Sequence, residues 1–171
     1  MASEDKYSGL KPYRIALEME KEGKQLFLDA ARATKSDLAR QTFEFLAKEE
    51  DRHLQQIEKF YRAMEESDGR GVPHVDDSDA DARLEGFNQR LESMRADFVS
   101  TASDIEAYRV ALKFENGAEE FYQEMLDRCD DPRIKRFYRW LIDEESMHSR
   151  LINSCLKFVE DPTEWFRRRK A

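Results

Sequence analysis

The sequence predicts an all-α protein, an antiparallel four-helix bundle in which two helical hairpins are joined by a long crossover. Three observations favour this fold. Charged residues make up 39% and hydrophobic residues 40% of the 171, with only 6 Gly and 4 Pro, a mixture typical of long helices with solvated outer faces. Turn signals are few and widely separated. Apolar residues recur in alternating steps of three and four along four long segments.

The first hairpin is expected over residues 10–66. Pro12 suits the first turn of a helix that runs to about Thr34. Ser36 followed by Asp37 is a typical N-cap signal for a second helix, which continues to the end of the hairpin. The two helices are separated by a short loop, so they should pack as antiparallel neighbours.

Residues 67–101 form the expected crossover. It opens with SDGRGVPHVDDSDAD, residues 67–81, the only stretch of the chain that is dense in Gly, Pro and Asp. A short amphipathic helix is expected after this loop, over about residues 82–98. His74 lies in the loop and is interpreted as a solvated side chain.

The second hairpin is expected over residues 102–160. Ser103 and Asp104 are typical cap residues for a third long helix. The sequence CDDP at 129–132 then breaks the chain, and its proline suits the first turn of a fourth helix. The remaining residues, 161–171, are expected to form a C-terminal tail that docks its aromatic side chains and leaves its charges in water.

Charge and length exclude several classes of protein. The net charge of -8 argues against nucleic acid as a partner, because phosphate binding needs a cationic face. No stretch approaches the roughly 20 apolar residues of a membrane span, and no secretory signal is visible at the N-terminus. Cys129 and Cys155 would lie about 35 Å apart along antiparallel helices, too far for a disulfide. We therefore expect one cytoplasmic domain over residues 1–171.

An internal repeat relates the two hairpins. A shift of 95 residues aligns the halves through their helices without a gap. Glu49-Glu50 then falls on Glu144-Glu145, and Phe27 falls on Tyr122. Two related hairpins that face one another predict a bundle with approximate twofold symmetry.

The apolar seams of all four helices are interrupted by ionisable residues at one level. A single glutamate interrupts the first and third seams, and a Glu-x-x-His pair interrupts the second and fourth. Glu and His three positions apart share one helix face. The six residues are Glu20, Glu50, His53, Glu115, Glu145 and His148.

Four carboxylates and two imidazoles in one core predict a site for two metal ions. The carboxylates alone would repel one another and would be costly to desolvate, whereas two divalent cations balance their charge. Carboxylate oxygen with imidazole nitrogen suits iron or manganese, and the absence of a thiolate argues against structural zinc. One Glu from each of two helices and Glu-x-x-His from the other two is the arrangement of di-iron carboxylate proteins.

On these residues the chain resembles the ferritin-like superfamily and, within it, the rubrerythrin-like proteins. The resemblance covers about residues 10–160 and includes an aromatic residue seven positions after each lone glutamate, Phe27 and Tyr122. It implies two iron ions, with manganese or zinc as substitutes, that react with hydrogen peroxide or dioxygen. It also implies the roles of the six residues: Glu50 and Glu145 as bridges, and Glu20, His53, Glu115 and His148 as terminal ligands.

Two departures from the rubrerythrin pattern are visible. The two Cys-x-x-Cys pairs of a rubredoxin-like domain are missing from these residues, so electrons are expected from an external donor protein. Rubrerythrins also carry an extra glutamate one turn after the third-helix ligand, where this chain has Ala118. Glu119 is adjacent but off the seam, and would serve only if the helix were rotated or bulged. The six-ligand set that remains is closer to the pattern of bacterioferritins.

Two functions follow from this reading. The first is a di-iron oxidoreductase that reduces peroxide or dioxygen. The second is an iron-handling protein, either a ferroxidase or a subunit for iron binding or storage. A homodimer favours the first and a larger homo-oligomeric cage favours the second. Two alternatives to these functions are accidental Glu-x-x-His pairs and a metal site with a purely structural role. Tyr122 is interpreted as core packing that can hydrogen-bond a ligand, in preference to a radical or proton-relay group.

Overall fold

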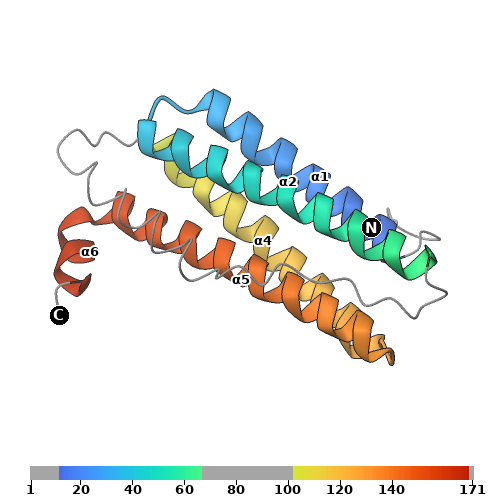
Figure 1. Ribbon diagram of the computed structural model, residues 1–171. Helices are drawn as coiled ribbons and strands as arrows, with labels where there is room; N and C mark the ends of the chain where they lie inside the picture. Colours follow the sequence, from blue (N-terminus) through green and yellow to red (C-terminus); the bar gives the residue numbers. More distant parts are fainter. Residues whose placement is uncertain (1–11, 67–101, 170–171) are drawn as a thin grey trace, which may run out of the picture.

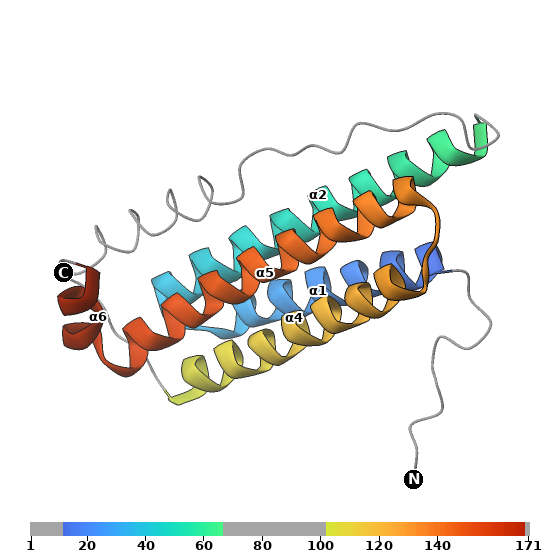
Figure 2. The same ribbon diagram turned by 90° about the horizontal axis from the view of Figure 1, so that it is seen from below.

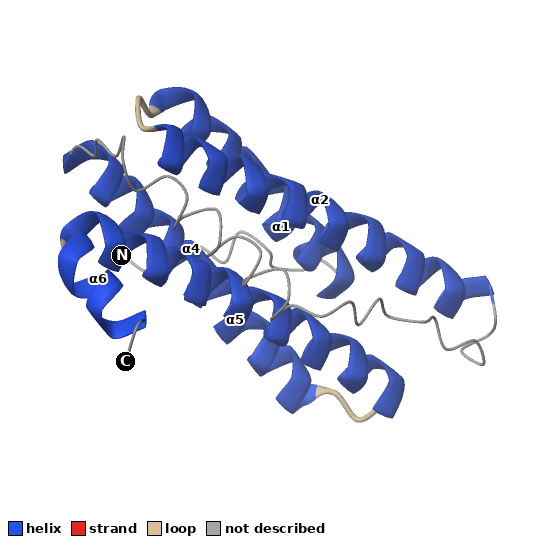
Figure 3. Cartoon of the chain, turned by 60° about the vertical axis from the view of Figure 1, so that its left-hand side comes forward, coloured by secondary structure: helices blue, strands red, loops and turns tan. Residues whose placement is uncertain are grey.

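The computed structural model describes residues 12–66 and 102–169, and these residues form a helical bundle (Figure 1). Helices α1 (Pro12–Ala33) and α2 (Asp37–Glu66) make the first hairpin, and α4 (Ala102–Arg128) and α5 (Pro132–Glu160) make the second. A short helix, α6 (Pro162–Arg169), follows. Helices account for almost all of these residues and none of them forms a strand (Figure 3), which confirms the predicted fold class. The short helix expected over residues 82–98 and His74 lie outside the described residues.

The two hairpins lie face to face. Within each hairpin the helices run antiparallel, and α1 lies beside α4 while α2 lies beside α5 (Figure 2). The turn between α4 and α5 is at the same end of the bundle as the start of α1 and the end of α2 (Figure 1). We call this the turn end; α6 lies at the opposite end. None of the helices in the described residues is long and apolar enough to cross a membrane.

Side chains cap the helices that begin after short loops. The hydroxyl of Ser36 accepts a hydrogen bond from the backbone N–H of Ala39 at 3.3 Å, which confirms the predicted cap of α2. At the start of α5, the Asp131 carboxylate accepts from the backbone N–H of Arg133 at 2.9 Å. Both caps satisfy N–H groups that have no partner within the helix.

Asp104, one of the two predicted cap residues, lies in the first turn of α4. Its buried carboxylate accepts a hydrogen bond from the hydroxyl of Thr34, in the loop between α1 and α2. This contact ties the two hairpins together at the end opposite the turn end.

Buried apolar side chains form two clusters along the bundle. One includes Phe27, Phe43 and Phe158, and the other includes Phe60 and Phe137. The predicted seams lie largely in these clusters. In α1 the seam of alternating steps of three and four that passes through Glu20 and Phe27 predicts Ala30 as the next core residue, but the buried residue is Ala31, because a straight helix of 3.6 residues per turn drifts away from a 3.5-residue repeat.

The expected C-terminal tail contains a helix that was not predicted. Asp161 caps α6 by accepting a hydrogen bond from the Glu164 N–H at 2.9 Å. Trp165 is buried, donates its indole N–H to the Ser154 hydroxyl at 3.1 Å, and packs edge-on against Phe158. The predicted docking of an aromatic side chain is therefore confirmed. The docked Trp165 ring holds α6, which is otherwise polar, against α5.

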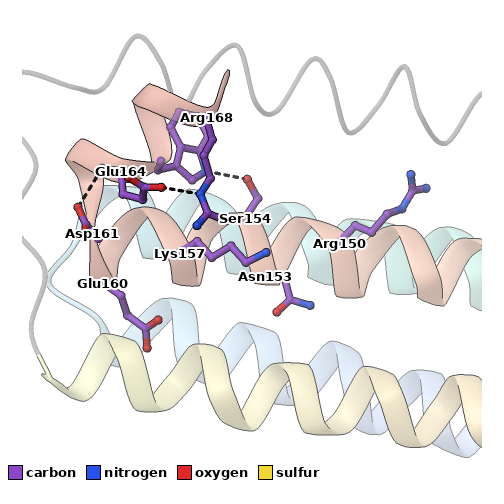
Figure 4. A pocket seen from close by; sticks show the side chains of 9 residues that line it. Arg150, Asn153, Ser154, Lys157, Glu160, Asp161, Glu164 and Arg168 are labelled. Atoms are coloured by element: carbon purple, nitrogen blue, oxygen red, sulfur yellow. Dashed lines mark hydrogen bonds and ion pairs between the residues drawn. The ribbon is translucent and has the colours of Figure 1, made fainter. Parts of the chain in front are cut away.

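A surface cavity of about 720 Å³ lies where α6 folds back on α5 (Figure 4). Its lining mixes both signs of charge, and Arg168 is already paired with Glu164 at 2.7 Å. A cavity of mixed charge selects neither anions nor cations, so we assign it no function. The charged lining residues are Arg150, Lys157, Glu160, Asp161, Glu164 and Arg168.

Gly23 allows α1 to pack closely at the level of the ionisable residues. A Cβ atom on Gly23 would lie 2.7 Å from Cε1 of Phe114 and 3.2 Å from Cδ of Glu50. A Cβ atom on Gly117 would meet nothing within 4 Å among the described residues. Both glycines are in helices, where alanine is favoured over glycine by about 1 kcal/mol.

We therefore expect Gly117→Ala to stabilise the fold and Gly23→Ala to be less stable than Gly117→Ala. Overpacking of a core typically costs about 1–3 kcal/mol, so the two variants should differ by about that amount. Urea unfolding of the metal-free proteins, followed by circular dichroism, measures the difference. Equal stabilities would show that the contact at Gly23 relaxes freely.

Candidate metal centre

The six residues predicted as ligands meet in the middle of the bundle. Each is at most 2% exposed. They lie along the helices between the two apolar clusters; Glu50, for example, falls between Leu46 and Ile57. All four long helices contribute: Glu20 from α1, Glu50 and His53 from α2, Glu115 from α4, Glu145 and His148 from α5.

Each hairpin pairs its lone glutamate with its own histidine. His53 Nδ1 lies 2.9 Å from Glu20 Oε2 in the first hairpin, and His148 Nδ1 lies 3.1 Å from Glu115 Oε1 in the second. The two imidazole rings stack with their centroids 5.0 Å apart and an interplanar angle of 13°. Equivalent pairs in the repeat thus make equivalent contacts, as approximate twofold symmetry predicts.

The other two glutamates lie between the histidines. Glu145 places Oε1 3.4 Å from His53 Nδ1 and Oε2 3.4 Å from His148 Nδ1. Glu50 places Oε2 3.8 Å from His53 Nδ1 and Oε1 3.4 Å from His148 Nδ1. Each carboxylate therefore directs one oxygen toward each half of the centre, which is the position that a carboxylate bridging two ions requires.

The donor atoms are close enough to hold cations. Within each of three overlapping groups, the ligand atoms all lie within 4.8 Å of one another. Each group combines carboxylate oxygen with imidazole nitrogen, a donor set suited to iron and manganese. The groups are Glu50, His53 and His148; Glu50, Glu115, Glu145 and His148; and Glu20, His53 and Glu145.

Several buried atoms of this cluster have no hydrogen-bond partner among the described residues. They include Oε1 of Glu50, Oε2 of Glu115 and both carboxylate oxygens of Glu145. An unsatisfied buried polar atom typically costs about 1–3 kcal/mol, and more when it is charged. Divalent cations would give these oxygens partners, so the residues present fit a two-metal site.

In the metal-free centre, burial and neighbouring charges favour the protonated forms of Glu50, Glu115 and His148. Burial raises the pKa of Glu50 well above its ordinary value, and the neighbouring Glu20 raises it further. Burial also raises the pKa of Glu115, although His148 opposes this. Burial alone would raise the pKa of Glu145, but the two histidines lower it below its usual range. Burial would lower the pKa of His148, yet the facing Glu115 carboxylate raises it well above its ordinary value.

The metal-free protein is expected to become less stable as the pH rises. A raised folded pKa contributes stability that is complete below the unfolded value and is lost as the pH rises through the folded value. This applies to Glu50 and Glu115 above about 4.5 and to His148 above about 6.5. Glu145, with a lowered pKa, acts in the opposite direction, but only below about 4.5. Melting temperatures of chelator-treated protein should fall between about pH 6 and pH 8; a rise would contradict the assigned shifts.

The sequence analysis also considered Tyr122 and Glu119 as residues that act near the centre, and the structure places only Tyr122 in contact with it. The Tyr122 hydroxyl donates a hydrogen bond to Oε1 of Glu20, one of the six predicted ligands, so the hydrogen bond expected from Tyr122 is present. Glu119 lies on a surface groove of α4 with other acidic residues, outside the cluster. Because α4 is a continuous α-helix, no bulge turns Glu119 inward, and Ala118 occupies the buried position.

The structure adds an ionic contact that the sequence analysis missed. Arg52 Nη2 lies between the buried carboxylates of Glu49, at 3.3 Å, and Glu144, at a shorter distance. Glu144 Oε2 is also 3.4 Å from His53 Nε2. We call these three residues, Glu49, Arg52 and Glu144, the Arg52 bridge. A signal was present, since the repeat aligns Glu49 with Glu144, but helix charges are by default assigned to solvent.

Comparison with known proteins agrees with this geometry. A family model described as Rubrerythrin matches residues 14–156, with a second match over residues 106–170. No curated protein and no solved structure matches the chain. Rubrerythrins are ferritin-like helical bundles that usually bind iron, and the first match includes all six residues of the centre. The chain therefore belongs to the rubrerythrin family.

Proposed function

We propose that this protein is a di-iron oxidoreductase that reduces hydrogen peroxide with electrons from an external donor protein. One observation carries the proposal: four carboxylates and two imidazoles, each at most 2% exposed, converge at one level of the core. In a low-dielectric interior such a set is stable when two divalent cations neutralise it. Iron is the ion that the donor set and the family favour, with manganese and zinc as substitutes.

The geometry supports one assignment of ligands. Glu50 and Glu145, which each direct one carboxylate oxygen toward His53 and the other toward His148, would bridge the two ions. The Glu20–His53 pair would complete one ion's coordination and the Glu115–His148 pair the other's.

Residues around the ligands orient them and keep water out. The Tyr122 hydroxyl donates to Glu20, and the Glu144 carboxylate accepts from Nε2 of His53, which leaves Nδ1 directed at the centre. Phe27 and Tyr122 are fully buried and limit the access of water. When bound, two iron(II) ions supply the two electrons that cleave the O–O bond of peroxide.

The reduced protein is expected to be oxidised faster by hydrogen peroxide than by dioxygen. Iron is first loaded anaerobically and quantified, so that metal binding is established separately from reactivity. Stopped-flow absorbance then follows oxidation by each oxidant. Repeated turnover should require an added electron donor.

The iron-handling function predicts different results. Dioxygen would then react faster, and iron oxidation would continue well beyond two ions per chain. A solution mass adds an independent measurement, because a dimer fits the redox enzyme and a large cage fits storage.

A further inference from the structure

Four of the chain's six tyrosines follow one another from the metal centre to the turn end of the bundle. Tyr122 donates its hydroxyl to Glu20 and stacks on Tyr138, with ring centroids 6.3 Å apart. Phe137 lies between Tyr138 and Tyr61, with its ring centroid 6.1 Å from that of Tyr138 and 6.2 Å from that of Tyr61. The ring of Tyr61 lies 4.5 Å from that of Tyr13, in the first turn of α1. We call Tyr122, Tyr138, Tyr61 and Tyr13 the tyrosine line.

Packing explains the rings of this line but not their hydroxyl groups. Aromatic pairs at such centroid distances are common in protein cores. The repeat offers a comparison within the same molecule, because Tyr122 and Tyr138 correspond to Phe27 and Phe43. These phenylalanines stack with centroids 6.4 Å apart, almost the same as the tyrosine pair. Phenylalanine therefore packs equally well in this position, and the tyrosines add buried hydroxyls that must find partners.

Exposure increases along the line away from the metal centre. Tyr122 is fully buried and Tyr138 is 3% exposed, whereas Tyr61 and Tyr13 are partly exposed. The hydroxyl of Tyr13 accepts a hydrogen bond from Arg14 Nε, a contact on the surface. Because Tyr13 lies in the first turn of α1, the line connects a buried centre with solvent at the turn end.

We propose that the tyrosine line carries oxidising equivalents from the metal centre to the surface when peroxide meets a centre that holds only one reducing electron. This inference rests on the proposed function. A phenol is a much weaker reductant than iron(II), so the tyrosines would not be oxidised during ordinary turnover. It would act when the donor protein has not restored both electrons, and it would spare the ligand residues from oxidation.

The step balances with tyrosine as the source of the missing electron. Hydrogen peroxide takes two electrons and two protons to give two waters. The centre supplies one electron and Tyr122 supplies the other. The phenolic proton of Tyr122 passes along the hydrogen bond to Glu20 and on to the peroxide, and the second proton comes from a water molecule, which leaves as hydroxide. Each next tyrosine then returns an electron and a proton to its neighbour nearer the centre. At Tyr13 a small thiol or another one-electron reductant restores the electron, and water restores the proton.

The experiment locates the oxidised residue and does not depend on turnover. Iron-loaded protein holding one reducing equivalent per centre receives one equivalent of hydrogen peroxide in the presence of a nitroso spin trap. Peptide mass spectrometry then maps the adducts. We expect adducts on Tyr13 and Tyr61 in the wild type. In Tyr138→Phe they should fall to the level of zinc-loaded protein, which holds no reducing equivalent, and oxidation should shift to Tyr122.

Two variants separate this result from an effect on folding. Tyr108→Phe removes another buried hydroxyl, bonded to Thr42 in the opposite cluster, and should match the wild type. The double variant Tyr122→Phe/Tyr138→Phe reproduces the Phe27–Phe43 pair, so it should fold and should lack adducts on Tyr13.

The outcomes also separate this inference from the proposed function. Wild-type yields of the Tyr13 adduct in Tyr138→Phe would overturn the line. So would the absence of any tyrosine adduct in wild-type protein that binds iron and consumes peroxide, a result that leaves the proposed function standing. A chain that binds no iron overturns both.

Discussion

Replacing Glu145 with glutamine is expected to weaken metal binding at both positions of the centre. Glu145 directs one oxygen toward each histidine at 3.4 Å, so both ions would lose a ligand and a negative charge. Loss of a residue that only hydrogen-bonds a ligand typically costs about 10–100-fold in metal affinity. Loss of a shared ligand should therefore exceed about 100-fold. Iron titration under anaerobic conditions, followed by metal analysis after gel filtration, measures the change.

Two further variants make this result specific. His53→Ala should weaken mainly one position, because His53 pairs with Glu20 on one side of the centre. Glu119→Gln changes a glutamate on the surface groove of α4 and should bind metal like the wild type. Circular dichroism of each metal-free variant checks that the helices remain. Full metal occupancy in Glu145→Gln would rule out a bridging role for Glu145.

The second large effect is expected at Arg52, where methionine should destabilise the metal-free fold. Arg52 is the only cation of the Arg52 bridge, and its partners are 8% and 2% exposed. Hydrogen bonds to charged groups contribute about 1.5–3 kcal/mol, and a buried charge that loses its counterion is costly. A fifth of the Arg52 side chain remains exposed, so water offsets part of the loss. We expect a decrease of about 2–3 kcal/mol in the free energy of unfolding.

Methionine is the informative replacement because the repeat places Met147 at the equivalent position. Urea unfolding at neutral pH measures the loss. Adding Glu49→Gln and Glu144→Gln to the Arg52→Met variant should recover part of the stability, since the two buried carboxylate charges that Arg52 contacts are then removed. If Arg52→Met alone stays within about 0.5 kcal/mol of the wild type, the value usual for surface substitutions, the bridge is a solvated contact.

The helices and the six centre residues could be predicted because both follow from periodicity along a single helix. Glu20 and Glu115 were visible as interruptions of apolar seams, and the repeat showed that the interruptions coincide. A side chain on the seam of a bundle helix faces the core whatever its chemistry. The sequence therefore predicted that these residues converge, although not which oxygen faces which histidine.

The Arg52 bridge and the tyrosine line depend on contacts between helices, which periodicity does not reveal. Glu49 and Glu144 become buried because α2 packs against α5 over a face wider than one seam. The tyrosine line draws on all four long helices, and its order is set by how the hairpins stack. Helix α6 was missed for another reason: its helix is short and polar, and the docking of Trp165 stabilises it.

The pairing of each lone glutamate with the histidine of its own hairpin has an evolutionary consequence. Each hairpin carries half of the centre, so two copies of one ancestral hairpin could have assembled the whole centre as a dimer. Two identical halves cannot be improved separately, since every mutation appears on both sides. Fusion into one chain removes that constraint. Arg52 opposite Met147, Gly23 opposite Ala118 and Tyr122 opposite Phe27 are differences that only a fused chain can accumulate, and each gives one side of the centre a property that the other lacks.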